Sequence, residues 1–118
     1  AIKMREKLKE LNKSWDENDT SRYWKNHGID SIKMRIGVHT GSVIAGNVGS
    51  VDMIQYSTIG DTVNVAARLE RANKEFGTNI LFGDEVYTSL TEKLHSQSTL
   101  SGEITLKGRA KPTKVYSI

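Results

Sequence analysis

The residues of this chain best suited to binding or catalysis are an asparagine and an arginine four positions apart, Asn64 and Arg68. They follow Gly60 and Asp61 in a segment whose pattern predicts a helix, and residues four apart share one helix face. A guanidinium there can meet a planar anion with two hydrogen bonds, while an amide can donate and accept. The periodicity is equally compatible with a simpler interpretation, in which Asn64 closes a local turn and Arg68 pairs with an acid.

The helices that surround this segment follow from apolar residues spaced three and four apart. This spacing predicts a first amphipathic helix over residues 1–15 and a later one that begins at residue 84 and continues through residue 94. The helix that carries Asn64 is expected to start at a cap formed by Asp61 or Thr62 and to stop at Gly77. Residues 16–30 are polar and predict a surface loop.

The strands follow from alternating apolar residues and from short apolar runs between turn residues. They are expected at residues 32–38, 43–48, 53–59 and 78–82, with two more between residues 99 and 118. The order α-β-β-β-α-β-α-β-β indicates an α+β fold in which helices pack against a mixed sheet.

The composition describes an ordinary globular domain and excludes several chemistries. The chain has 118 residues, a net charge of +3 and no cysteine, which rules out disulfides, thiol nucleophiles and Cys-ligated zinc. Its three histidines lack ligand spacing, so we expect no histidine metal site. Basic residues of the first helix alternate with glutamates, which favours a solvated face over a nucleic-acid surface. No apolar run is long enough to span a membrane.

Four segments together resemble the catalytic domain of class III nucleotidyl cyclases. They are MRIGVHTGSVIAGNVGS, YSTIGDTVNVAARLE, NILFGDEVY and LKGRAKPTKVYSI. The resemblance extends from about residue 32 to residue 118, and the combination of a Gly-rich hairpin, IGDTVNVAARLE and a closing LKG is highly specific. It implies a ferredoxin-like mixed sheet with helices against it.

The resemblance also implies a division of labour between two subunits. In this family two catalytic domains pair head to tail, and one supplies two aspartates for two Mg²⁺ or Mn²⁺ ions. The other supplies an asparagine that orients the ribose and an arginine that stabilises the transition state, which match Asn64 and Arg68. Lys107 matches a lysine that contacts the triphosphate. Ser57 matches a position that helps to read the base, and Thr58 beside it is also assigned to substrate binding.

The residue at position 57 favours ATP without deciding between the nucleotides. Bacterial adenylate cyclases often have Thr or Ser at this position, whereas guanylate cyclases commonly have Cys. The hydroxyl of Ser57 can accept from an adenine amine, but it can also donate to a guanine carbonyl. We therefore expect an adenylate cyclase-type domain, with two alternatives: a guanylate cyclase, or a non-catalytic regulatory or partner half-domain of the same fold.

The metal-binding segment of the family is expected to precede the first helix and has no counterpart in residues 1–118. We therefore expect a single partial catalytic domain, truncated at its N-terminus, that lacks the first strand and all metal ligands. Asp61 is better explained as a helix cap than as a metal ligand. The isolated chain is expected to be inactive and to need a second cyclase domain. The parent is expected in the cytoplasm, with or without a membrane anchor. A basic RNA-binding domain is the least favoured alternative, because suitable strand aromatics are absent.

Overall fold

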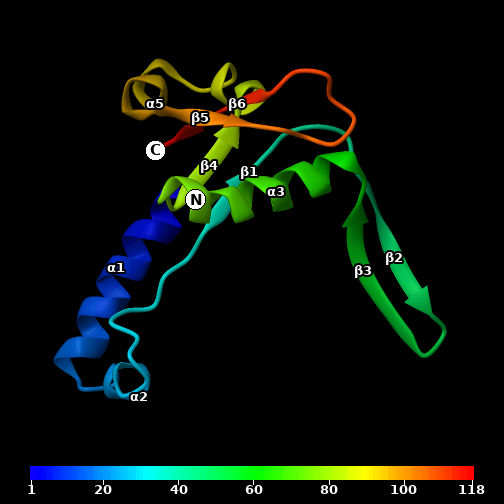
Figure 1. The fold of residues 1–118 in the computed structure, drawn as a ribbon. Coiled ribbons are helices and arrows are strands. Elements are labelled where there is room, and N and C mark those ends of the chain that lie inside the picture. Colours follow the sequence, from blue (N-terminus) through cyan, green and yellow to red (C-terminus); the bar gives the residue numbers. More distant parts are fainter. The chain divides into compact units, whose positions relative to one another are not determined.

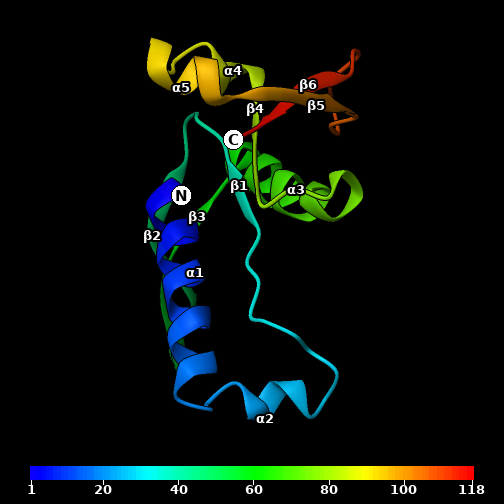
Figure 2. The ribbon, with the colours of Figure 1, turned by 90° about the vertical axis from the view of Figure 1, so that its left-hand side faces the viewer.

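The computed structural model describes the backbone of residues 1–118 and the side chains of residues 1–52 and 57–118. The chain divides into two compact units, Ala1–Arg35 and Ile36–Ile118. The elements, labelled in Figures 1 and 2, are α1 (Ile2–Glu17), α2 (Arg22–Lys25), β1 (Ile36–Val38), β2 (Ile44–Ser50), β3 (Met53–Ile59), α3 (Asp61–Phe76), β4 (Ile80–Gly83), α4 (Asp84–Tyr87), α5 (Glu92–Gln97), β5 (Thr99–Ile104) and β6 (Thr113–Ser117). None of the helices in this described part combines the length and apolarity needed to cross a bilayer.

The first unit contains α1 and the short α2. The helix α2 lies in residues 16–30, for which the sequence predicted only a loop. Trp24 of α2 meets Trp15 of α1 edge to face, with ring centroids 5.4 Å apart. The strand expected from residue 32 was wrong in extent, since β1 begins at Ile36. At the expected start of the strand, the side-chain amide of Asn12 donates to the Ile32 carbonyl at 2.8 Å, and its oxygen accepts from the Ile32 N–H at 3.0 Å. The backbone of Ile32 is therefore already paired.

The second unit is built around a four-stranded sheet in the order β1-β4-β6-β5. β1 runs parallel to β4, whereas β4 and β6, and β5 and β6, are antiparallel. The predicted mixed sheet is therefore confirmed. In Figures 1 and 2, α3 lies on one side of β5 and β6, and α4 and α5 lie on the other. The buried core joins α3 to the sheet and contains Val65, Leu69, Ala72, Leu81, Ile104, Leu106 and Val115.

The β2–β3 hairpin (residues 44–59) forms a separate two-stranded sheet. Its register pairs Ile44 with Ile59 and Ser50 with Met53. Figure 1 shows the hairpin leaving the N-terminal end of α3 and pointing away from the four-stranded sheet. Several exposed apolar residues lie in it or beside it: Val43, Ile44, Val48, Val51 and Ile59. An isolated two-stranded hairpin is only marginally stable in water, so packing of its apolar surface against another layer would stabilise it.

The helix α3 begins and ends where the sequence predicted, but its N-terminus is not capped by the expected residue. The N-cap is Gly60, with φ 140° and ψ 173°, and neither Asp61 nor Thr62 makes a capping bond within the described residues. The hydroxyl of Thr62 instead donates to the carbonyl of Ser42 at 2.7 Å, which ties the helix to the turn before β2. Gly77 ends the helix in a left-handed conformation, as predicted.

A buried asparagine joins α3 to the first strand. The side-chain amide of Asn73 donates to the carbonyl of Ile36 at 3.0 Å and to the carbonyls of Leu69 and Glu70 at 3.2 and 3.1 Å. Its oxygen accepts from the Thr78 hydroxyl at 2.8 Å. Because Asn73 is only 1% exposed, these bonds satisfy a group that would otherwise be costly to bury.

The helix predicted from residue 84 through residue 94 was wrong, because two shorter helices, α4 and α5, take its place. The hydroxyls of Thr88 and Ser89 both donate to the carbonyl of Glu85, at 3.1 and 3.0 Å. Side chains that bond to nearby backbone in this way compete with regular helix. Thr91 then starts α5 as its N-cap residue in an extended conformation.

Candidate functional site

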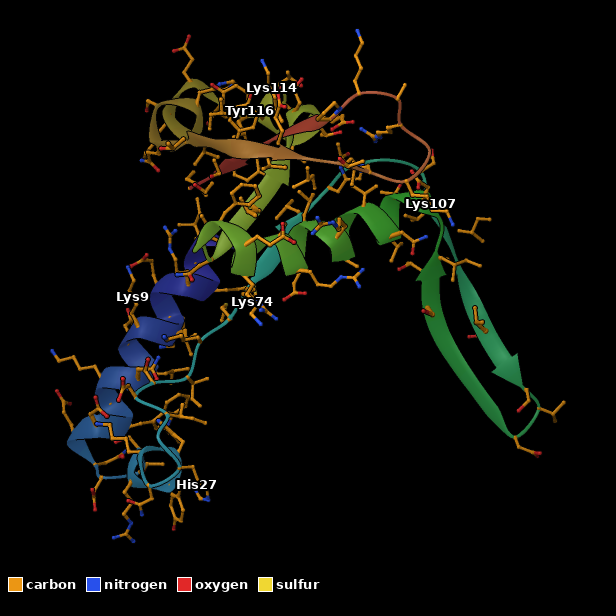
Figure 3. The ribbon with its side chains drawn as sticks, viewed as in Figure 1. Lys9, His27, Lys74, Lys107, Lys114 and Tyr116 are labelled. Atoms are coloured by element: carbon orange, nitrogen blue, oxygen red, sulfur yellow. The ribbon has the colours of Figure 1, made fainter. Side chains whose placement is uncertain are left out.

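A cleft of about 300 Å³ lies between α3 and the loop that follows β5. The helix contributes polar and charged side chains, and the loop contributes the other wall. Figure 3 shows Lys107 in this loop, near the N-terminal end of α3. The residues that line the cleft are Asp61, Asn64, Val65, Arg68, Arg71, Thr105, Leu106 and Lys107. Three of the five residues assigned from the sequence thus share one cavity: Asn64, Arg68 and Lys107.

The side chain of Asn64 is exposed in this cleft. Its backbone N–H bonds to the Gly60 carbonyl at 3.3 Å as part of the first helical turn. Among the residues whose side chains are described, none forms a hydrogen bond with the Asn64 amide. The local turn bond of the simpler interpretation is therefore not made, and the amide is free to bind a ligand.

Arg68 behaves as the simpler interpretation predicted, because it pairs with an acid. Its Nη1 lies 2.8 Å from Oε1 of Glu75, two helical turns further along α3. The Arg68 side chain is 34% exposed and the Glu75 side chain 55%, and ion pairs this accessible to water contribute little stability. A ligand anion can therefore replace Glu75 at a small cost in free energy.

The loop that carries Lys107 is held by an ion pair just beyond it. Arg109 Nη1 lies 2.8 Å from Oε1 of Glu85 on α4, and the Arg109 N–H bonds to the Leu106 carbonyl at 3.2 Å. A hydrogen bond from its own backbone N–H lowers the pKa of Glu85; burial opposes this change and Arg109 adds to it. Gly108, with φ 80°, supplies the left-handed turn between Lys107 and Arg109. These contacts hold the backbone that follows Lys107, which itself lines the cleft.

The structure does not bring Ser57 and Thr58 into this cleft. Both lie on β3, where they pair with Gly46 and Ala45 of β2. Ser57 is half-buried and Thr58 is exposed. Within the described residues, neither of them lines the cavity that contains Asn64. Any contact that they make with a substrate must therefore be made at the hairpin.

Two charged residues of the cleft were not assigned a role there from the sequence. Asp61 occupies the first turn of α3, where a carboxylate suits the positive end of the helix dipole, and it also lines the cavity. Arg71 stands three residues after Arg68 and seven after Asn64. This i, i+4, i+7 spacing puts Arg71 on the same helix face, and the spacing alone could have identified it.

The family of the chain follows from comparison of its sequence with known proteins. The sequence profile of the family described as the adenylate and guanylate cyclase catalytic domain matches residues 1–118. The chain belongs to this family. The match includes the first helix, so the relationship extends further toward the N-terminus than the segment beginning at residue 32 that the motifs indicated.

Individual cyclases agree with the family assignment. Adenylate cyclase 1 of Rhizobium meliloti (strain 1021) is 35% identical over 91 residues, which are 77% of this chain and 13% of that protein. An adenylate cyclase of Anabaena cylindrica is 31% identical over 119 residues, covering 100% of this chain and 23% of that protein. The crystal structure of the adenylyl cyclase CyaB from P. aeruginosa superposes with a TM-score of 0.63 at 28% identity, over 98% of this chain and 53% of that one. The chain thus spans a minor part of the curated relatives.

Cyclases of this family generally use divalent metals, and the residues described here do not fit such an ion. No group of three or more His, Asp or Glu side chains in the described part of the chain is arranged to hold one. In the cleft, the carboxylate of Asp61 shares the walls with Arg68, Arg71 and Lys107. A predominantly cationic lining repels a metal ion and attracts a phosphate.

Proposed function

We propose that the protein containing this chain is an adenylate cyclase that converts ATP to 3′,5′-cyclic AMP and pyrophosphate at a dimer interface. In this proposal the chain provides the asparagine-arginine half of the site, and the carboxylates that bind Mg²⁺ or Mn²⁺ come from outside residues 1–118. The observation that carries the proposal is that Asn64, Arg68 and Lys107 line one cleft. The family membership of the chain makes cyclisation the reaction that these groups suit best.

The reaction requires positioning and charge stabilisation, which these side chains can supply. The ribose 3′-oxygen loses its proton and attacks the α-phosphorus, a 3′-oxygen–phosphorus bond forms, and the bond to the β-phosphate breaks to release pyrophosphate. Because the attack is intramolecular, orienting the ribose through Asn64 favours the reactive conformation. Arg68 offers a planar fork to the phosphoryl oxygens as negative charge accumulates, and Lys107 provides a point charge to the triphosphate.

The exposed ion pair of Arg68 gives this mechanism a simple first step. In the absence of a nucleotide, the guanidinium contacts Glu75 at 2.8 Å. A phosphoryl group entering the cleft competes for the same guanidinium and offers more negative charge. We therefore infer that Arg68 exchanges Glu75 for the substrate when the nucleotide binds.

Base recognition is assigned to the hairpin rather than to the cleft. Ser57 and Thr58 lie on β3, one after the other, so their side chains point to opposite faces of the strand. In a dimer, either face can meet a base held mainly by the second domain. This assignment keeps ATP as the proposed substrate and GTP as the alternative, since a serine hydroxyl can serve either base.

Dimerisation is supported by the apolar surface of the hairpin. Ile44 is 70% exposed and Val51 is 93% exposed, and Val48 and Ile59 add further apolar area. The hairpin projects away from the four-stranded sheet (Figure 1), so the sheet does not cover it. A second cyclase domain is the partner that the family relationship favours, and we place this catalytic assembly in the cytoplasm.

We expect Ile44→Lys to weaken self-association of the full-length protein at least ~10-fold, because it introduces a charge into an apolar contact. Sedimentation equilibrium of wild type and variant measures the change. Leu100→Lys is the matched control, since Leu100 is also an exposed apolar residue, 54% accessible, but lies on β5. If Ile44→Lys and wild type dimerise equally well, the hairpin does not form the interface.

The test of the proposed function is an assay of the full-length protein with ATP and with GTP, in Mg²⁺ and in Mn²⁺. We expect cyclic AMP from ATP, identified by chromatography and mass, and no cyclic nucleotide from residues 1–118 alone. Cyclic GMP as the main product would favour the guanylate cyclase alternative. The second candidate is a regulatory half-domain of the same fold. It predicts no turnover alone but stimulation of a separate cyclase domain.

A further inference from the structure

We propose that Arg71 is an additional substrate-binding residue, which holds the non-reacting phosphates of the nucleotide beside Arg68. This inference rests on the proposed function, because it assigns Arg71 to the same polyphosphate. The family motif assigns one guanidinium to this cleft, that of Arg68, and the inference adds that of Arg71. The substrate group that Arg71 recognises is the β,γ-diphosphate, which becomes the pyrophosphate product.

The position of Arg71 along α3 suits a chain of phosphates. Asn64, Arg68 and Arg71 line the same cleft from successive turns of one helix. Seven residues of α-helix rise about 10 Å, so the three side chains form a row rather than a cluster. If Asn64 meets the ribose and Arg68 the α-phosphate, the next group along the row is a distal phosphate. Lys107 closes the cleft from the opposite wall.

The contacts of Arg71 leave its charge available for a ligand. Its Nε donates to the Ala67 carbonyl at 3.4 Å, which positions the side chain without neutralising it. Arg71 is exposed, and no carboxylate pairs with it among the side chains that the structure describes. Glu75 lies one turn further along, but its Oε1 bonds to Arg68. The guanidinium nitrogens beyond Nε can therefore bind phosphate oxygens bidentately.

Arg68 and Arg71 should affect different kinetic constants. Arg68 faces the phosphorus at which charge builds up, so its contribution grows in the transition state. Arg71 faces phosphates that carry their charge throughout, so it binds the substrate and the transition state about equally. Uniform binding of this kind changes KM and leaves kcat nearly unaltered. The two arginines are therefore distinguishable by experiment.

The experiment compares Arg71→Gln with wild type in the full-length protein, in two assays. In steady-state kinetics with ATP, we expect KM to rise about tenfold, the effect of one charged hydrogen-bonded contact, with kcat within about twofold. In direct titration with inorganic tripolyphosphate, we expect the Kd to rise by a similar factor. Arg71→Lys should recover part of each loss, because lysine keeps the charge but loses the fork.

Lys74→Gln is the matched control for charge removal. Lys74 is an exposed cation on α3 near its C-terminal end (Figure 3), outside the cleft, so this variant should leave KM and Kd unchanged. Unchanged KM and Kd in Arg71→Gln would overturn the inference. An equal effect of both variants would overturn it too, because it would reflect only general electrostatics. If wild type makes no cyclic nucleotide but Arg71→Gln still weakens tripolyphosphate binding, the proposed function fails and the phosphate role of Arg71 stands.

Discussion

Replacing Arg68 with alanine should lower the turnover of the full-length protein by ~10²–10³, the loss typical of one preorganised donor to a developing charge. The effect should appear in kcat, with only a modest change in KM, because the guanidinium gains most of its interaction energy in the transition state. Steady-state cyclase assays of wild type and variant under the same metal conditions measure this loss.

Glu75→Ala is the control that separates chemistry from stability in this test. Both variants remove the same 2.8 Å ion pair, so any effect of losing it on folding should be common to both. Only Arg68→Ala removes the guanidinium. We expect Glu75→Ala to keep wild-type kcat and to lower KM slightly, since the nucleotide no longer competes with a carboxylate. An Arg68→Ala enzyme with unaffected turnover would remove Arg68 from the mechanism.

Gly37→Ala should destabilise the fold strongly. A Cβ on Gly37 would clash with the Ala66 carbonyl oxygen and the Glu70 amide nitrogen, both backbone atoms of α3. Since backbone cannot yield as a flexible side chain does, β1 and α3 must separate. Overpacking typically costs about 1–3 kcal/mol, and we expect the upper end or more here. Urea unfolding of wild type and variant measures the change in the free energy of unfolding.

Gly46→Ala is the matched control for this substitution. A Cβ on Gly46, in β2, meets no atom within 4 Å. The added methyl group should therefore leave the free energy of unfolding within about 0.5 kcal/mol of wild type, as at most surface positions. If Gly37→Ala is as stable as Gly46→Ala, the close approach of β1 to α3 does not limit stability.

Much of the fold could be predicted because local patterns carry it. The apolar stripe of α3 and the stop at Gly77 are properties of adjacent residues, and both agree with the structure. The errors occur where non-local or competing bonds intervene. Asn12 occupies the backbone of Ile32, and hydroxyls bonded to Glu85 break the helix expected after residue 84. Hydrophobic periodicity contains no information about such side-chain bonds.

The sequence by itself determined the family, the mixed α+β fold and the residue types of the site. It placed Asn64 and Arg68 on one helix face because helical periodicity is a local property. Only the tertiary structure decided that Lys107, remote in sequence, closes the same cleft, and that Ser57 and Thr58 lie outside it. It also decided that Arg68 pairs with Glu75, while Arg71 lines the same cleft and bonds through Nε to the Ala67 carbonyl. The physical reason is that the spacing of residues along the chain specifies the helix face on which a side chain lies. The groups that this side chain contacts depend on all the elements that pack around that face.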